Sequence, residues 1–459
     1  MRKSNLQGLS FVFFQAGFHH GAVRLFEQFS RDAFKLCRNK IIMTALILAT
    51  AVMAYCGADY GFKVEQIPAS GFAKPGDKVS FKFTLLEKGK PVNLPFRVNL
   101  HVEGKKNEVI NGTGVITVNA VAPEYGFIYA SGSCRNGKKK SAPNFYSVGV
   151  NPEKIRQGMP EPSDFDAFWN EAKKDIAAMP VNPSIKSVPV TIPELKDKVN
   201  CFEVRLDAPG KRRVFGYLSM PKNAKAGSLP AIIIFDGAGI YVHKPDNAIN
   251  FAGKGFLALS VNAHGVEYGQ ETTLDDLIAK MKKQRYYTVL DWDKPKVVPF
   301  YDMIVRDLCG LEYLKNRPEW DGKNLISYGD SQGGAQSLAV TGLSPEITFC
   351  YAGVPGLCNH GGIDKNQARG WPGNFSWNAK TRKTAGYLDN CNFASRIKCP
   401  VLVTAAWNDY LTKPSTVYAA YNNISSPKEF IPYPDKGHWP AIVATREKAL
   451  KEINNHLKK

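Results

Sequence analysis

Two different patterns of apolar residues divide the chain. Between residue 61 and about residue 150, short runs rich in β-branched and aromatic residues alternate with turn-forming clusters, as in KVSFKFTLLE, FRVNLHVEG and GVITVNAV. Beyond residue 151, nearly continuous apolar runs such as PAIIIFDGAG and FLALSVNAHG alternate with segments of helical periodicity. The first pattern is typical of an antiparallel β-sandwich, and the second is typical of a parallel sheet covered by helices on both faces.

The patterns predict three segments. We expect an N-terminal extension over residues 1–58, an immunoglobulin-like sandwich over residues 59–150 and an α/β region over residues 151–459. The sandwich has no acid–base constellation, so it is interpreted as a spacer or a glycan-contact module. The α/β region opens with the predicted helix DFDAFWNEAKKDI, for which Ser163 or Asp164 can supply the N-terminal cap.

The N-terminal extension contains one long uncharged stretch. Residues 41–58, IIMTALILATAVMAYCGA, carry no charge and follow Arg38 and Lys40. A basic segment followed by an apolar one, with small residues near Ala54, is typical of a cleaved export signal. The sequence therefore predicts a periplasmic or extracellular protein, with an uncleaved membrane anchor or a buried helix as the alternatives.

The composition is basic and favours no nucleic-acid partner. The chain has 60 Lys and Arg against 41 Asp and Glu, a formal net charge of +19. The basic residues are scattered in short runs, and no nucleic-acid-binding module is recognisable. A basic surface of solvated loops is the interpretation, and an anionic envelope or acidic glycans remain compatible neighbours.

The nine cysteines form no metal-binding pattern. No CxxC pair or metal-ligand spacing occurs, so we expect no metal and no cofactor. Cys350 and Cys358, and likewise Cys391 and Cys399, are eight residues apart and could form disulfides in an exported protein. Buried free thiols are the alternative.

The stretch YGDSQGG predicts a nucleophile. Ser331 lies between Gly329 and Gly333, with an apolar strand before it and a helical segment after it. A catalytic serine on a strand–turn–helix bend needs glycines at these two positions, because the backbone is strained and the helix packs close to the strand. The helix N-terminus also presents backbone N–H groups to negative charge.

The residues downstream of Ser331 supply a base and an acid in the order that α/β-hydrolases use. Asp409 follows the apolar run VLVTAAWND, and His438 follows FIPYPDKGH. His438 would accept the proton of Ser331, and Asp409 would orient the imidazole. Asp389 and Asp435 are rival acids, but neither directly ends an apolar strand, and the other downstream histidine, His360, lies too early. The fold class is therefore predicted as an α/β-hydrolase.

Two further features complete the predicted site. The backbone N–H groups of Gln332 and of Ala238, in the loop DGAG, are expected to form the oxyanion hole. Trp371 and Trp377 lie in the segment 359–388, where hydrolases insert a cap over the pocket. Their rings either stack on sugar faces at the pocket mouth or pack the cap onto the sheet, and both interpretations leave a small acyl pocket.

Between residues 160 and 439 the chain resembles the acetyl xylan esterase and cephalosporin C deacetylase family, carbohydrate esterase family seven. The motifs GDSQGG, RIKCPVLVTAAWND and PSTVYAAYNNISSPKEFIPYPDKGH carry the resemblance. It implies serine-dependent removal of acetyl groups from xylo-oligosaccharides or other small sugars without a metal. It also implies that Ser331, Asp409 and His438 form the triad.

Three positions depart from the pattern of this family. His264 stands where the family has the arginine of Arg-Gly-Gln, Asp236-Gly237-Ala238 replaces His-Gly-Tyr, and His438-Trp439 replaces His-Glu. We expect these changes, together with the additional N-terminal region, to alter the substrate pocket and the ring-shaped hexamer of the family. Whether the chain forms a homo-oligomer is therefore left open by the sequence.

The sequence supports three function classes in decreasing order. The first is a serine esterase acting on acetylated oligosaccharides, with a general short-chain carboxylesterase as its close variant. The second is a peptidase like prolyl oligopeptidase, which shares the elbow and the triad order but needs a larger gating domain. The third is a non-catalytic glycan-binding protein, which the intact triad disfavours.

Overall fold

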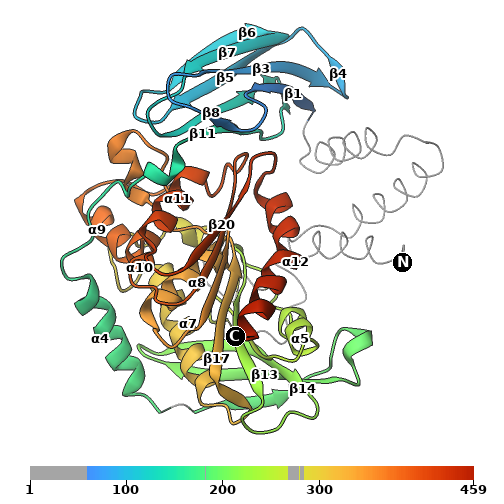
Figure 1. Cartoon of the computed structure of the whole chain (residues 1–459), viewed down its shortest axis with the longest axis vertical. Coiled ribbons are helices and arrows are strands. Elements are labelled where there is room, and N and C mark those ends of the chain that lie inside the picture. The colour runs from blue at the N-terminus through green and yellow to red at the C-terminus, as the bar shows by residue number, and fades with distance from the viewer. Residues whose placement is uncertain (1–58, 181, 267–275, 277–278, 280–283, 459) are drawn as a thin grey trace.

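The structure, a computed structural model, describes residues 59–180, 182–266, 276, 279 and 284–458 (Figure 1). The apolar stretch predicted as an export signal lies outside the described residues. Within the described ranges, no helix combines the length and the apolar character that crossing a membrane requires. The chain forms a β-rich region over residues 60–150 and a hydrolase region after it.

Two larger sheets and one two-stranded sheet form the β-rich region. A four-stranded sheet has β3 at its centre, paired with β1 and β7 and with the short β4, and a five-stranded sheet has the order β2-β11-β8-β5-β6. The first sheet consists of β1 (Tyr60–Ile67), β3 (Lys78–Glu87), β4 (Lys90–Pro91) and β7 (Val115–Val121). The second consists of β2 (Phe72–Ala73), β5 (Pro95–Val102), β6 (Glu108–Thr113), β8 (Gly126–Ser133) and β11 (Tyr146–Val150), and β9 (Arg135–Asn136) and β10 (Lys139–Lys140) pair with each other.

Alternating side chains close the space between the two larger sheets. Val79, Phe81 and Phe83 of β3 point inward, while Lys78 and Lys82 on the opposite face are exposed or nearly so. This alternation is what a strand with one buried face requires. The predicted β-rich sandwich is therefore present, whereas its immunoglobulin-like topology stays a prediction.

Strand β8 is buried on both faces. Ile128 and Ala130 belong to the core between the two sheets, and Phe127 and Tyr129 belong to the core of the hydrolase region. Figure 1 shows β8 and β11 on the side of the β-rich region that faces the hydrolase region. Because successive strand residues point to opposite faces, one continuous apolar run FIYA serves both cores.

A nine-stranded sheet forms the centre of the hydrolase region, in the order β12-β13-β14-β16-β15-β17-β18-β19-β20. The pairs from β16 to β20 are parallel, and those from β12 to β16 on the other side are antiparallel. The strands are β12 (Ser184–Ser187), β13 (Val199–Ala208), β14 (Arg212–Pro221), β15 (Leu229–Phe235), β16 (Leu257–Val261), β17 (Trp320–Asp330), β18 (Phe349–Gly353), β19 (Val401–Ala406) and β20 (Lys428–Tyr433).

Helices cover both faces of this sheet, as predicted. Along β15, Ala231 and Ile233 face one helical layer and Ile232 and Ile234 face the other. Figure 1 shows α5 and α12 on one side and α7, α8, α9 and α10 on the other. The helices are α4 (Phe165–Ala177), α5 (Asp246–Ala252), α7 (Pro299–Lys315), α8 (Gln332–Leu343), α9 (Ala379–Leu388), α10 (Asn390–Ala394), α11 (Pro414–Asn423) and α12 (His438–Leu457), with short 3₁₀ turns at 152–154, 193–195, 284–289 and 360–365.

Two local predictions need correction. Asp164 does occupy the position before α4, but its side chain makes no capping bond; both carboxylate oxygens instead accept from the hydroxyl of Tyr387 at 2.7 Å. The suggested disulfides Cys350–Cys358 and Cys391–Cys399 do not form, because all four residues are buried free thiols. Cys350 lies inside strand β18, where its Sγ is 3.4 Å from the hydroxyl of Ser337.

The junction between the two regions is polar as well as aromatic. The indole N–H of Trp407, which follows β19, donates to the carbonyl of Gly71 at 2.8 Å, and Ser147 Oγ donates to the carbonyl of Trp407 at 2.6 Å. The Trp407 ring packs edge-on against Phe127 with centroids 5.2 Å apart. The β-rich region therefore contacts the segment that leads out of β19 toward Asp409.

Candidate active site

Ser331 lies on a strained bend between β17 and α8. Its backbone has φ 61° and ψ −119°, in the region that residues with a side chain rarely adopt. A Cβ on Gly329 would lie 2.2 Å from the carbonyl oxygen of Gly333, and one on Gly333 would lie 2.3 Å from that of Phe235. Both glycines are therefore required, and the predicted elbow is present.

The structure brings the three predicted triad residues together. Ser331 Oγ is 2.9 Å from His438 Nε2, and His438 Nδ1 is 2.5 Å from Asp409 Oδ2. The exposed fractions of Ser331, Asp409 and His438 are 7%, 0% and 3%. The imidazole thus has an acceptor for its Nδ1 proton, which leaves Nε2 free to take a proton from the hydroxyl.

Asp409 is held by its own loop. Its Oδ1 accepts from the backbone N–H groups of Leu411 and Thr412 at 2.8 and 3.0 Å, and Thr412 Oγ1 donates to Oδ2 at 2.8 Å. These donors stabilise the carboxylate form that the imidazole needs beside it. His438 begins α12, whereas the sequence predicted it in a loop.

Neither rival acid reaches this histidine. Asp389 is buried in the turn before α10, where it accepts from the backbone N–H groups of His360 and Cys391. Asp435 is exposed and pairs with Lys436 at 3.0 Å. The geometry therefore selects Asp409 among the downstream acids, as the strand-end argument predicted.

The two predicted oxyanion donors lie on neighbouring segments, one in the loop after β15 and one at the start of α8. Strands β15 and β17 are parallel neighbours with Phe235 opposite Gly329, so the loop 236–239 after β15 lies beside the elbow. Gln332 is the first residue of α8, where backbone N–H groups have no intrahelical acceptor. Ala238 and Ser331 line the same crevice of about 230 Å³.

Tyr287, which the sequence did not predict, connects the loop 236–239 with the start of α8. Its hydroxyl donates to Gln332 Oε1 at 2.6 Å and accepts from the backbone N–H of Gly239 at 3.1 Å. His264 adds a second tie, with Nε2 3.0 Å from the carbonyl of Gly239. No motif marks Tyr287, and only the tertiary fold brings it to the elbow.

Most of the hydrolase region matches a known protein family. Residues 153–456 match the sequence profile of the family described as Acetyl xylan esterase (AXE1), which covers more than half of the chain. The chain belongs to this family. Family membership makes it a carboxylic ester hydrolase and argues against the peptidase prediction, as does a β-rich region built mainly of two larger sheets rather than a propeller.

Proteins that are similar to the chain are also named as acetyl esterases or acetyl xylan esterases. The chain is 34% identical over 302 residues to "Acetyl esterase Axe7A" of Xylanibacter ruminicola, a match that covers 64% of this chain and 67% of the relative. Two solved structures share the fold. An acetyl xylan esterase from Paenibacillus sp. R4 has a TM-score of 0.56 at 24% identity and covers 66% of this chain and 98% of its own. Acetyl xylan esterase 1 from Thermoanaerobacterium sp. JW/SL YS485 has a TM-score of 0.53 at 23% identity, and the match covers 66% of this chain and 97% of that protein.

The three departures from the AXE1 family pattern all lie around the elbow. Burial lowers the pKa of His264 to about 4, so its imidazole is neutral at neutral pH and its Nε2 carries the proton donated to Gly239. Asp236 contacts His243 at 2.6 Å and accepts from Asn247, which anchors the loop 236–239, the predicted oxyanion loop, to α5. Trp439 is 47% exposed and lines the crevice at Ser331.

The two tryptophans predicted to contact sugar are engaged in contacts with other side chains and backbone of the protein. Trp371 packs edge-on against Phe300 and lies beside Gly356, and the Trp377 indole N–H donates to Asp364 at 2.8 Å. The Arg369 guanidinium is 4.7 Å from the Trp377 ring. These contacts favour the packing interpretation, and neither ring is among the described residues that line the crevice at Ser331.

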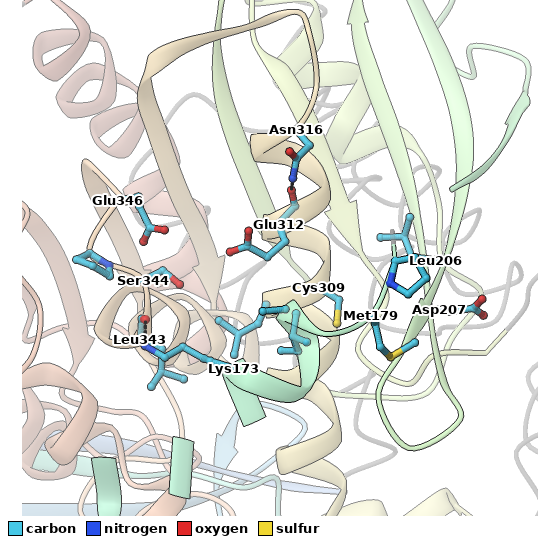
Figure 2. A pocket seen from close by; sticks show the side chains of 15 residues that line it. Lys173, Met179, Leu206, Asp207, Cys309, Glu312, Asn316, Leu343, Ser344 and Glu346 are labelled. Carbon is cyan, nitrogen blue, oxygen red and sulfur yellow. Dashed lines mark hydrogen bonds between the residues drawn. The ribbon is translucent and has the colours of Figure 1, made fainter. Parts of the chain in front are cut away.

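Another cavity of the described residues lies away from this crevice. It measures about 600 Å³ and is lined by Lys173, Glu312 and Leu343 among others (Figure 2). Leu343 ends α8, whose 12 residues begin next to Ser331. At 1.5 Å per residue the two ends of α8 are about 17 Å apart, so this cavity does not belong to the AXE1 site. The described residues also hold no cluster of three or more His, Cys, Asp or Glu that could bind a metal ion.

Proposed function

We propose that the protein is a serine esterase that removes acetyl groups from acetylated xylo-oligosaccharides or related small sugars through an acyl-enzyme. One observation carries this proposal. In a chain of the acetyl xylan esterase family, the Ser331 hydroxyl is 2.9 Å from an imidazole that is itself bound to a buried carboxylate. A hydroxyl becomes a useful nucleophile at neutral pH only when such a base is in place.

The first half of the reaction transfers the acetyl group to the enzyme. Ser331 Oγ attacks the acetyl carbonyl while His438 Nε2 takes the hydroxyl proton. The carbonyl electron pair moves to oxygen, where the N–H groups of Gln332 and Ala238 donate to it. The pair then returns, the bond to the sugar oxygen breaks, and His438 gives its proton to that oxygen, so that the sugar leaves as an alcohol.

The second half restores the enzyme by the same steps. Water replaces the sugar, His438 takes one of its protons, and the resulting hydroxide attacks the acetyl-serine carbonyl. The second tetrahedral species collapses, Ser331 Oγ recovers its proton from His438, and acetic acid leaves and loses its proton to water to become acetate. Throughout, Asp409 stays ionised and balances the positive charge that forms on the imidazole.

The crevice at Ser331 supports a short acyl group. Its volume of about 230 Å³ lies below the range of roughly 300–1,000 Å³ in which drug-sized ligands bind. Each methylene that does not fit a tight slot costs about 1–3 kcal/mol. With aryl esters we therefore expect kcat/KM to fall at least about tenfold from acetate to butyrate. Equal or rising values would indicate a general carboxylesterase instead.

The central test is the exchange of the nucleophile. Ser331→Ala should lower kcat on acetylated xylo-oligosaccharides by several powers of ten while the unfolding midpoint changes little. Ser337→Ala is the matched control in the same helix, because that hydroxyl bonds Ser327 and the carbonyl of Tyr351 and touches no triad residue. Near-normal turnover by the Ser331 variant would refute the proposed mechanism.

We also propose that the protein is exported. The support is the uncharged stretch of residues 41–58 after Arg38 and Lys40. Cell fractionation together with N-terminal sequencing of the mature protein tests this. A protein retained in the cytoplasm with an uncut N-terminus would contradict the proposal.

A further inference from the structure

A third cavity lies where the β-rich region meets the hydrolase region. This junction groove measures about 460 Å³, within the usual range for ligand sites. His101, Lys105 and Lys106 line it from the β-rich region, and Gln367, Arg369 and Lys413 line it from the hydrolase region. It is therefore built by both regions and is separate from the crevice at Ser331.

The groove is strongly basic. Three lysines and one arginine line it, and none of its described lining residues is Asp or Glu. Lys413 is half-buried immediately before α11, at a helix N-terminus that disfavours a cation. Burial also lowers the pKa of Lys413, although the buried Glu103 opposes this shift. Holding a cation in such a place costs free energy, which an anion in the groove would offset.

The groove wall also carries polar atoms whose hydrogen-bonding capacity is unused. Within the described parts of the chain, His101 Nε2, Gln367 Oε1 and Arg369 Nε and Nη2 are covered yet have no hydrogen-bond partner. Each such atom destabilises the protein relative to one that has a hydrogen-bond partner. Small side-chain movements on ligand binding would let these groups pair with hydroxyl or carboxylate oxygens.

Aromatic rings add an apolar surface beside these polar groups. Tyr129 and Phe145 line the groove and stack with centroids 5.1 Å apart, and Lys413 Nζ is 6.0 Å from the centre of the Phe145 ring. A ring face flanked by amides and cations suits a ligand that has C–H faces, hydroxyl groups and a negative charge. A sugar carrying a carboxylate has all three.

We infer that the junction groove binds an acidic saccharide unit, a sugar bearing a carboxylate, of the polysaccharide whose acetyl groups the active site removes. This inference rests on the proposed function. Lys413 lies four residues after Asp409 in the segment between β19 and α11, so the groove and the triad share one loop. Acetylated chains with acidic substituents are then preferred over neutral ones.

Calorimetric titration of the full chain tests the groove without any turnover. The probes are a deacetylated xylo-oligosaccharide carrying a glucuronate branch and the unbranched oligosaccharide of equal length. We expect the charged probe to bind at least about tenfold tighter, and this difference to shrink between about 50 mM and about 500 mM salt. Lys105→Gln/Lys106→Gln should weaken binding of the charged probe about fivefold to tenfold.

A second double variant serves as the control for this experiment. Lys138→Gln/Lys140→Gln removes two exposed lysines of the same region outside the groove and should leave binding unchanged. Both double variants should hydrolyse aryl acetate like the unmodified protein. Equal affinity for the two probes, or an equal loss of affinity in both double variants, would overturn the inference. So would binding of the unbranched oligosaccharide carrying a sulfate group as tightly as the glucuronate-branched probe. Binding without any turnover of acetylated sugars would refute the proposed function and leave the groove standing.

Discussion

The loop of the predicted catalytic acid and the predicted oxyanion loop are held in opposite ways. Trp407 and Asp409, in the acid loop between β19 and α11, are completely buried, and the β-rich region contacts Trp407 by rings and hydrogen bonds. The oxyanion loop 236–239 is half-buried or exposed and is tied by a few polar side chains. A group that keeps its charge throughout the reaction can be held rigidly, whereas a loop that admits substrate must stay open on one side.

The largest effect is expected from the acid loop. Asp409→Asn should lower kcat by about 10⁴-fold, because the amide cannot hold the imidazole in the tautomer that accepts from Ser331. Steady-state kinetics on acetylated oligosaccharide measures this. Asp435→Asn is the control, since that exposed carboxylate pairs with Lys436 and does not contact the triad, so its loss should not matter. A loss of tenfold or less in the Asp409 variant would mean that another group orients His438.

The buried support of the acid loop should matter for stability. Trp407→Ala removes a completely buried ring and should destabilise the protein by about 3–5 kcal/mol. Urea unfolding compares it with Trp439→Ala, in which the lost ring is 47% exposed and the expected change is small. Similar unfolding midpoints for the two variants would contradict the claim that the β-rich region supports this loop.

The polar support of the oxyanion loop should matter for turnover more than for stability. Tyr287→Phe removes the hydroxyl between Gly239 and Gln332 and should lower kcat about tenfold to 100-fold, or roughly 1.4–2.7 kcal/mol. KM and the unfolding midpoint should change little. Tyr301→Phe, another buried tyrosine whose ring packs near α4, serves as the control. If the Tyr287 variant raises KM instead, the residue acts on binding rather than on the oxyanion loop.

The smallest effect concerns pH. The pKa of His264 is about 4 in the folded protein, below its ordinary value of 6.5, because burial disfavours the charged form. Between these two pKa values the unfolded chain binds a proton at His264 and the folded chain does not. The contribution of His264 to the free energy of unfolding is therefore lost as the pH falls from 6.5 toward 4. Between about pH 7 and about pH 5.5 the loss should be about 1 kcal/mol.

His264→Gln separates this contribution from other groups. Its side-chain amide can still donate to Gly239 but does not titrate, so unfolding free energies of the two proteins should converge as the pH falls. Parallel pH profiles would show that His264 carries no such linkage.

The features of the site that were predicted from the sequence depend on residues that are close together in the chain. The elbow follows from glycines two positions either side of Ser331, and Asp409 follows from a continuous apolar strand. Tyr287 could not be predicted, because its role depends on a contact with Gln332, 45 residues away and unmarked by any motif. The Asp164 cap failed for a similar reason, since the hydroxyl of distant Tyr387 competes for its carboxylate. Cysteine spacing likewise carries no information on whether two thiols face each other.

Because β8 is buried on both faces, the two regions should unfold together. A strand that supplies core residues to both cannot leave one without damaging the other, so heat should melt the whole described chain in one calorimetric transition. Proteolytic removal of the first 150 residues would uncover the Trp407 ring and the apolar surface around it. The shortened hydrolase should then aggregate rather than work as a smaller enzyme, because a large exposed apolar patch recruits other copies.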